Sequence, residues 1–420
     1  MNKRALILIT TSYPYGNEEV FITEELKYLS KDFNVIILSR SIEMDTPRPV
    51  PSGVIVINIP AKSSLFYKLF ISPFVLLSNS FIIGQLLVHE ILELRRLKIS
   101  LNRPRLIKML HDLGKGIELK YHLNKIVKQY CSKQSIPILY SYWMINPALA
   151  IALMNKRYIK IARIHRFDLF FEDDHLKYLS FQRFKVSRLN KLYFVSLHGK
   201  SYWEKKFGNR YNNLEVSKLS TPIGKYLPAS LRGGKIIASC SHLIHFKRVH
   251  LIIEALSLID NIMLNWVHFG SGELYNELKN NAELLLKDKS NIQFKFMGQT
   301  GNADIRAYYA NNNPDLFIHT SSSEGLPVSI IEALSYGIPV IGLDADGVKE
   351  VVSSRNGELL PRDATPAEIA RSIEKILLLP AKKIEKLREE SYRLWEQNHH
   401  PVKNNNHFIQ SIQSLANEGS

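Results

Sequence analysis

Short apolar runs recur along the chain, and many are followed by a turn and a stretch with apolar residues on one helical face. Residues 5–9 and 34–38 have the pattern of buried strands. Between them, Ile22, Leu26 and Leu29 share one face of a predicted helix. Further strands are expected at residues 137–140, 159–164, 192–196, 236–239, 291–297, 316–319 and 338–343, and from residue 266. Because parallel strands need a crossover connection, this order predicts an α/β protein with βαβ units.

The length of 420 residues exceeds what one hydrophobic core normally uses, so two domains of ~150 to 200 residues are expected. A stretch rich in Pro and Gly, residues 221–234, marks the linker. It separates a first domain at 1–222 from a second at 235–395. A polar tail with a weak helix at 408–415 covers 396–420. The N-terminus lacks a signal-peptide pattern, so a cytosolic location is expected. Cys131 and Cys240 lie far apart and predict no disulfide framework.

Charge is distributed unevenly between the two halves. Residues 1–224 hold 34 Lys and Arg against 17 Asp and Glu, whereas the remaining residues hold 21 against 22. Eleven basic residues and two acidic ones lie between positions 95 and 133. This asymmetry indicates an anionic partner for the first half, either a membrane surface or nucleic acid. The alternative is a solvated helix face.

An uncharged stretch, residues 69–88, precedes that basic run. It is long enough to span a membrane, but Pro, Ser, Asn, Gly and Gln dilute its hydrophobicity. A helical hairpin that packs on the domain or enters the lipid interface is therefore favoured over a true span. Apolar surface beside Lys and Arg is typical of proteins that bind an anionic leaflet.

The most informative stretch is 315–343, which is predicted to form a strand, a turn, a helix at 328–336 and a second strand. Its turn, 324–327, lies at the carboxyl end of a strand, where a helix N-terminus offers free N–H groups to a phosphate. Helical spacing turns Glu332 away from the sheet, so its carboxylate can accept hydrogen bonds from ribose hydroxyls. Glu324 could accept from a second polyol. The alternative is an ordinary loop carboxylate and a solvated helix residue.

This string, with Glu324, Gly325, Leu326-Pro327 and Glu332-Ala, resembles the nucleotide-sugar signature of the retaining glycosyltransferases of family 4. The resemblance implies the GT-B fold, an α/β architecture of two Rossmann-like domains that face a central cleft. It also implies that Glu324 contacts the donor sugar and Glu332 the ribose. The backbone of Gly325, Leu326, Pro327 and Val328 would then lie near the phosphates.

A second loop, 241–248, resembles the family segment in which an Arg and a Lys five residues later neutralise the donor's diphosphate. Lys247 matches that Lys, but His242 occupies the Arg position. Arg248 is the candidate for the missing guanidinium, because a departing diphosphate needs fixed positive charge. The alternative is that these residues are solvated surface. By the same resemblance, Gly298 begins the loop that borders the base.

The first half resembles the acceptor domain of bacterial family 4 enzymes that build surface polysaccharides, through its Pro-Tyr-Gly turn ending at Gly16. Gly16 would let backbone approach a ligand, or would merely relieve turn strain. Residues 163–168 resemble the family's Arg-x-His-x-x-Asp segment, which places His165 near the transferred sugar. Arg166 stands where the family usually has Gly. A lone histidine is otherwise more often structural.

Asp344-Ala345-Asp346 spells an Asp-x-Asp motif that binds metal in another glycosyltransferase fold. No metal site is expected here, because two carboxylates without a third ligand would repel a diphosphate. No cofactor is expected either, and a UDP-sugar is favoured over a GDP-sugar as donor substrate.

In GT-B proteins the last helices cross back to the first domain.

These features predict a metal-independent, retaining hexosyltransferase with His165, Lys247 and Glu324 as catalytic residues. Its acceptor is expected to be a polyprenyl-diphosphate-linked saccharide in capsule, O-antigen or exopolysaccharide synthesis. The predicted location is the inner face of the cytoplasmic membrane, as a peripheral protein on an anionic surface.

Alternatives within the same fold are a nucleotide-sugar epimerase and a soluble disaccharide synthase, for which the basic first half has no evident use. A nucleic-acid-binding protein would explain the charge, but carboxylates at 324 and 332 would repel a phosphate backbone. A non-catalytic protein that binds a sugar nucleotide is the remaining alternative.

Overall fold

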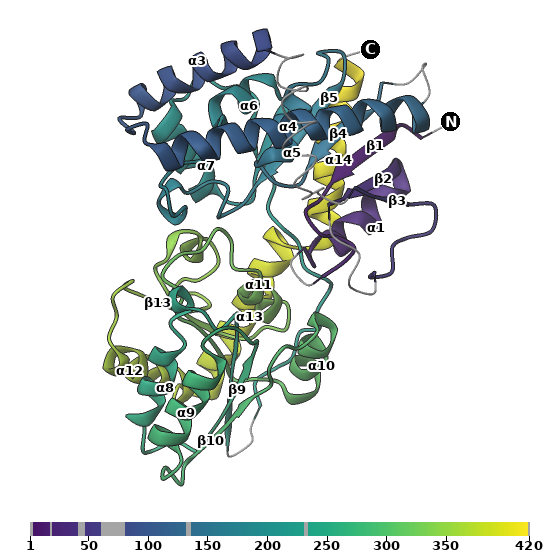
Figure 1. The fold of residues 1–420 in the computed structure, drawn as a ribbon. Coiled ribbons are helices and arrows are strands. Elements are labelled where there is room, and N and C mark those ends of the chain that lie inside the picture. The colour runs from purple at the N-terminus through teal and green to yellow at the C-terminus, as the bar shows by residue number, and fades with distance from the viewer. Residues whose placement is uncertain are drawn as a thin grey trace. The chain divides into compact units, whose positions relative to one another are not determined.

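The computed structural model describes residues 3–16, 19–40, 47–59, 80–131, 136–230 and 234–418. The chain divides into two compact units (Figure 1). The first unit contains Met1–Lys218 and Asn405–Ser420, and the second contains Leu219–Asn404. Residues 231–233 of the predicted linker lie outside the described residues.

The first unit is built on a parallel sheet, whose strands within the described ranges have the order β3-β2-β1-β4-β5-β6-β7. The strands are β1 (Ala5–Ile9), β2 (Asn34–Ser39), β3 (Ile55–Asn58), β4 (Ile138–Ser141), β5 (Ile159–Ile164), β6 (Lys191–Phe194) and β7 (Leu214–Val216). Alternate residues of β1 enter two different core clusters, Ile7 on one side and Leu6 and Leu8 on the other. Both faces of the sheet are therefore covered, which explains the continuous apolar runs of its central strands.

Helices of the first unit lie on both sides of this sheet. They are α1 (Ile22–Asp32), α3 (Ser80–Arg96), α4 (Arg103–Tyr130), α5 (Asn146–Ala152), α6 (Gln182–Arg188) and α7 (Leu197–Phe207), with a 3₁₀ turn at Phe171–Asp173. Both α3 and α4 contribute to a smaller core through Leu86, Leu94, Met109 and Leu113. Residues 69–79 of the predicted apolar stretch lie outside the described residues, and the rest of it opens α3. Among the helices of the described segments, none has the length and hydropathy needed to cross a membrane.

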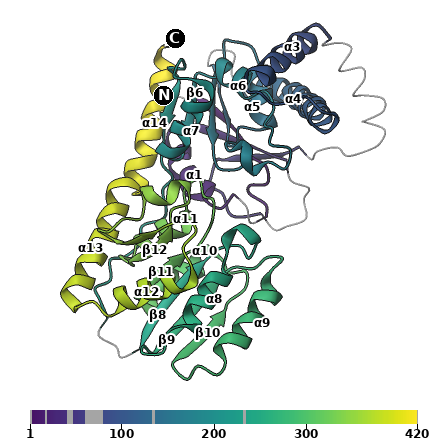
Figure 2. The ribbon, with the colours of Figure 1, turned by 90° about the vertical axis from the view of Figure 1, so that its left-hand side faces the viewer.

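The last helix, α14 (Pro401–Glu418), belongs to both units. In the first unit, Phe408 and Ile412 are buried in the core that contains β1 and α1. Its Ser411 lies 2.9 Å from the Tyr193 hydroxyl of β6, and Figure 2 shows α14 running beside that strand. The sequence predicted only a short weak helix at 408–415, because the amphipathic pattern of this segment is diluted by Asn and Gln.

The second unit is also a parallel α/β sheet, with strand order β10-β9-β8-β11-β12-β13 in the described part. The strands are β8 (Lys235–Cys240), β9 (Leu264–Phe269), β10 (Ile292–Phe296), β11 (Leu316–His319), β12 (Val340–Leu343) and β13 (Gly357–Leu360). The helices are α8 (His250–Ser257), α9 (Tyr275–Leu286), α10 (Asn302–Asn312), α11 (Val328–Leu334), α12 (Pro366–Leu377) and α13 (Ala381–Asn398), with 3₁₀ turns at His245–Lys247 and Asp346–Glu350. The order reverses between β8 and β11, so their carboxyl-end loops lie at a topological switch point.

Candidate functional site

The loop after β11 carries Glu324, whose carboxylate is buried in the second unit. Its Oε1 accepts hydrogen bonds from Lys247 Nζ and, at 2.9 Å, from His319 Nε2. Because a carboxylate only accepts, the His319 proton must lie on Nε2 in this bond. Burial would raise the pKa of Glu324, but Lys247 and His319 more than offset it and hold that pKa well below its usual range. Glu324 is therefore a buried, fixed negative charge held by two side chains of the second unit.

Glu332, on α11, is only 4% exposed, so the alternative of a solvated helix residue is wrong. Its Oε1 accepts a hydrogen bond from Asn302 Nδ2 at 3.1 Å and lies 3.6 Å from Arg306 Nη1. Both partners belong to α10. Burial raises the pKa of Glu332, and Asn302 and Arg306 oppose that change. The carboxylate is thus oriented by a neighbouring helix that sequence spacing did not connect with it.

Lys247 and Arg248 follow β8, and Arg248 has a left-handed backbone with φ +48°. The Arg248 guanidinium donates to the Thr320 and Ser321 carbonyls at 3.0 and 3.4 Å. In return, Thr320 Oγ1 donates to the Lys247 carbonyl at 2.9 Å. Arg248 therefore ties the loop after β8 to the loop after β11. His242 is exposed in the same loop.

Glycines shape the neighbouring loop after β9. A β-carbon on Gly270 would lie 1.9 Å from the Ser241 carbonyl oxygen, and one on Gly272 would lie 2.4 Å from that of Leu243. The Gly-Ser-Gly turn therefore permits close packing on the loop after β8. Gly298 has φ +67° and accepts a hydrogen bond from Gly270 N at 2.9 Å.

The turn that holds Gly325 is supported by the segment after β12. A β-carbon on Gly347 would lie 1.9 Å from the Gly325 carbonyl oxygen. Asp346 Oδ2 accepts from Glu324 N at 3.3 Å, and its Oδ1 accepts from Arg362 Nη2 at 2.8 Å. One carboxylate of the Asp-x-Asp string is therefore used to hold loops together. Within the described ranges, no group of three or more potential metal-ligating side chains occurs.

In the first unit, His165 follows β5 and is buried among aromatic rings. Its ring centroid lies 4.4 Å from that of Trp143, 5.0 Å from Tyr142 and 5.8 Å from Phe21. Its Nε2 is buried and has no hydrogen-bond partner among the described residues. Burial, together with the charge of Arg163, lowers the pKa of His165 well below its ordinary value. A neutral imidazole with an unused nitrogen is suited to a hydroxyl ligand.

The other residues of the Arg-x-His-x-x-Asp segment have structural partners. Arg163 is buried and forms an ion pair with Glu25 at 2.9 Å. Asp168 accepts from the backbone N of His165 at 2.7 Å and of Met144 at 2.6 Å, and burial raises its pKa to about 6. These contacts hold the loop that presents His165.

Sequence reasoning missed Glu19, which is fully buried. Its carboxylate accepts from the backbone N of Thr11, Ser12 and Tyr13 at 2.9, 2.7 and 2.6 Å. It also accepts from Trp143 Nε1 at 2.5 Å. Glu19 therefore fixes the turn after β1 and the indole against which His165 packs. A Glu beside apolar Val20 and Phe21 was the available signal.

Gly16 closes the same turn with φ +63°, and its carbonyl accepts from Arg48 Nη2.

Sequence reasoning also missed His319, Asn302 and Arg306. Of these, only His319, which ends a buried strand, had a position that sequence analysis could have identified.

Comparison with known proteins identifies part of this architecture. Residues 229–394 match the family described as Glycosyl transferases group 1. An uncharacterized glycosyltransferase of Haemophilus influenzae (strain ATCC 51907 / DSM 11121 / KW20 / Rd) is 26% identical over 199 residues, which are 46% of this chain and 54% of the relative. The GtfA subunit of a UDP-N-acetylglucosamine–peptide N-acetylglucosaminyltransferase of Streptococcus agalactiae is 25% identical over 198 residues, 44% of this chain and 38% of that protein. The chain thus spans about half or less of the length of these relatives.

The crystal structure of Anabaena Alr3699/HepE in complex with UDP-glucose superposes with a TM-score of 0.67 at 15% identity, covering 98% of this chain and 100% of that one. At this identity the likeness shows the fold. The chain has the GT-B fold, an α/β architecture with two parallel-sheet domains, which confirms the predicted fold class. Together, the matched domain and the fold support a GT-B glycosyltransferase.

Proposed function

We propose that this protein transfers a hexosyl group from a nucleotide sugar to a lipid-linked saccharide, with retention of configuration, as a member of family 4. The observation that carries the proposal is the Lys247–Glu324–His319 cluster at the switch point of the second unit, in which Glu324 and His319 are buried. Such a cluster offers a cation for phosphate and a fixed carboxylate for sugar hydroxyls.

The donor is proposed to be a UDP-sugar. Glu332 would accept hydrogen bonds from the ribose hydroxyls, and its contact with Asn302 holds the carboxylate in place. Gly298 would border the base, and the backbone of Gly325, Leu326, Pro327 and Val328 would lie near the phosphates. The Anabaena structure in complex with UDP-glucose supports a UDP-sugar for this fold.

Lys247 is proposed to stabilise the negative charge that develops on the departing nucleoside diphosphate, without a metal ion. Arg248 and His242 remain candidates for the same diphosphate, although the Arg248 guanidinium already donates to two carbonyls. In the first unit, His165 is proposed to hydrogen-bond a sugar hydroxyl through Nε2, and Gly16 lets backbone approach the ligand. The donor's own phosphate would take the acceptor proton.

The acceptor is proposed to be a polyprenyl-diphosphate-linked saccharide of surface-polysaccharide synthesis, reached from the inner face of the cytoplasmic membrane. The first unit supports this because Val88 and Leu92 of α3 are 59% and 58% exposed beside the basic run. Part of that run serves the fold instead. Arg96 pairs with Glu93 at 3.3 Å, and Lys108 pairs with Asp174 at 2.5 Å.

A peptide acceptor is the second candidate, because the name of the Streptococcus agalactiae relative states peptide glycosylation.

Incubating the full chain with labelled nucleotide sugars and either a bacterial lipid extract or a peptide mixture separates the lipid acceptor from the peptide acceptor. We expect label from one UDP-sugar in the lipid fraction, retained anomeric configuration by NMR, and no inhibition by a chelator. Label only in peptide would reject the lipid acceptor, and no transfer with any donor would reject the enzyme.

A further inference from the structure

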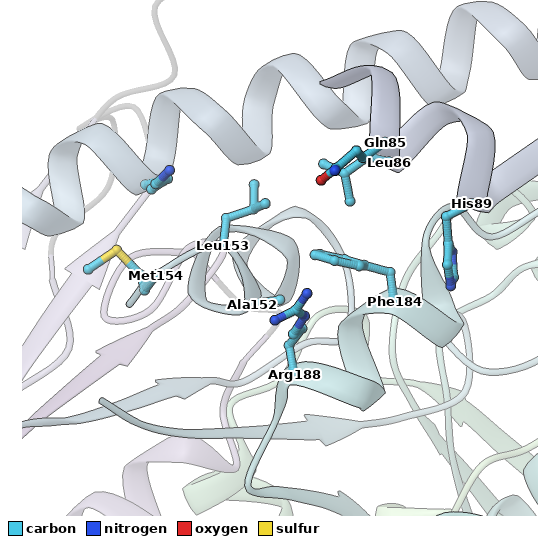
Figure 3. A pocket seen from close by; sticks show the side chains of 9 residues that line it. Gln85, Leu86, His89, Ala152, Leu153, Met154, Phe184 and Arg188 are labelled. Carbon is cyan, nitrogen blue, oxygen red and sulfur yellow. The ribbon is translucent and has the colours of Figure 1, made fainter. Parts of the chain in front are cut away.

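A cavity of about 330 Å³ lies in the first unit between α3, α4, α6 and the end of α5 (Figure 3). It is separate from the surroundings of His165. Lys160, near the start of β5, donates to the Met154 carbonyl at the cavity at 2.8 Å, whereas His165 follows the other end of that strand. At ~3.3 Å per residue, five residues of strand separate the two places by about 16 Å.

The cavity has an apolar side and a cationic side. Leu86 and Met154 are buried in its wall, and Phe184 faces the space that they enclose (Figure 3). The basic side consists of Lys120 and Arg188, and no Asp or Glu is among the nine lining residues. Within the described part of the chain, neither of these two cations forms an ion pair with a carboxylate.

His89 adds an unused polar atom to this cavity. Its Nδ1 is buried and has no hydrogen-bond partner among the described residues, while its ring lies edge-on to Phe184 with centroids 6.2 Å apart. The Arg188 guanidinium lies over the Phe184 ring, 5.5 Å from the ring centroid. A buried polar atom without a partner is uncommon in a folded protein and is consistent with a missing ligand group.

Neighbouring charges confirm that this edge of the unit is electropositive. Burial, together with the charges of Arg188 and Lys156, lowers the pKa of Lys160 to about 8. Burial and the charges of Arg183 and Arg188 also lower the pKa of His89, against the opposing effect of Glu93. A group that adds negative charge beside Arg188 would relieve this repulsion.

We propose that this cavity binds the phosphate headgroup and first methylene groups of an anionic membrane lipid. Lys120 and Arg188 would pair with the phosphate, His89 Nδ1 would hydrogen-bond the headgroup, and Leu86 and Phe184 would contact hydrocarbon. The volume is near the lower limit of ligand pockets, so most of the acyl chain would remain in the bilayer. Val88 on α3 precedes His89, and Tyr121 on α4 follows Lys120. Both side chains are 59% exposed, which suits contact with the boundary between headgroups and acyl chains.

The inference deepens the proposed membrane association, and short-chain lipids test it without a bilayer. Calorimetry on the full chain would compare dihexanoyl phosphatidylglycerol, below its micelle concentration, with dihexanoyl phosphatidylcholine and inorganic phosphate. We expect the anionic lipid to bind at least tenfold more tightly than either alternative probe. Phosphate binding as tightly as the anionic lipid would overturn the lipid assignment in favour of a free-anion site, and no binding of the anionic lipid would overturn the site itself.

Three variants and one control locate the binding. Arg188→Glu and Lys120→Glu should each weaken the anionic lipid at least tenfold. Lys128→Glu is the matched control, because it makes the same charge change at an exposed position of α4. Leu153→Trp should block the cavity without changing charge. Equal weakening by Lys128→Glu would overturn the proposal, since it would indicate diffuse attraction only.

Binding of UDP separates this inference from the proposed function. Both charge reversals should leave UDP affinity unchanged, because Lys247 and Glu332 lie in the other unit. A protein that binds the anionic lipid in the cavity but no nucleotide would contradict the proposed transferase while leaving the lipid site intact.

Discussion

Two histidines, one in each unit, have different surroundings. His165 comes directly after β5, and His319 ends β11, so each lies at the carboxyl end of a buried parallel strand. The ring of His165 packs against Trp143 and leaves Nε2 without a partner among the described residues. The ring of His319 instead donates to the charged carboxylate of Glu324.

The difference shows that strand position alone does not assign a chemical role. Around His165 the neighbours are aromatic rings, and burial keeps the imidazole neutral, which favours a sugar face or hydroxyl. Around His319 the neighbours are Lys247 and Glu324, an ionic pair suited to phosphate and hydroxyl groups. The following predictions test this division between a neutral site and an ionic site.

The largest expected effect concerns the ionic site. Lys247→Ala should lower turnover by ~10²- to 10³-fold, because the fixed cation opposite the leaving diphosphate is lost. Steady-state kinetics with the preferred donor measures it. Lys289→Ala is the matched control, since Lys289 pairs with Asp260 away from this loop. Wild-type turnover in a folded Lys247 variant would move the diphosphate site elsewhere.

Glu332→Ala should weaken nucleotide binding by ~2 to 4 kcal/mol, because ribose hydroxyls lose a buried charged acceptor. Calorimetry with UDP measures this change. Glu358→Ala serves as the control, because Glu358 pairs with the exposed Lys375 at 2.8 Å. Unchanged affinity in a folded Glu332 variant would reject the ribose assignment.

The neutral site should make stability depend on pH. The folded-state pKa of His165 lies below its unfolded value of about 6.5, so the unfolded chain binds more protons and stability is lost as pH falls from 6.5. Each pH unit over which the unfolded chain holds one more proton than the folded protein corresponds to a loss of about 1.4 kcal/mol.

His165→Phe, which keeps an aromatic ring, should remove that part of the slope in denaturant unfolding at several pH values. Other titrating groups are common to both proteins, so the difference between the two slopes isolates His165. Equal slopes would mean that His165 has the same pKa in the folded and unfolded protein, so that its surroundings do not favour the neutral ring.

The smallest expected effect concerns His319, which hydrogen-bonds Glu324 at 2.9 Å. His319→Leu should reduce kcat/KM about tenfold, because one hydrogen bond to a charged group is worth ~1.5 kcal/mol or more. His319→Gln keeps an N–H donor and should recover part of the loss. If Gln and Leu variants behave alike, the ring acts by packing and not by orienting the carboxylate.

Local patterns in the sequence were sufficient for the central strands of both sheets, whereas the short strands β3, β7 and β13 were not predicted. The strands predicted at 5–9 and 159–164 coincide with β1 and β5, because continuous apolar runs between turns are visible within a few residues. The helix predicted from 328 to 336 ends at Leu334, and the following strand starts at Val340. Element ends depend on capping contacts, which local periodicity does not specify.

The sequence by itself determined the α/β class, the presence of two domains, and the eight-residue spacing from Glu324 to Glu332. Only the tertiary structure decided which groups hold each carboxylate. Glu324 meets Lys247 from 77 positions away, and Trp143 reaches Glu19 across 124 positions. The physical reason is that desolvation and hydrogen bonding act between neighbours in space, and folding brings together residues that share no local pattern.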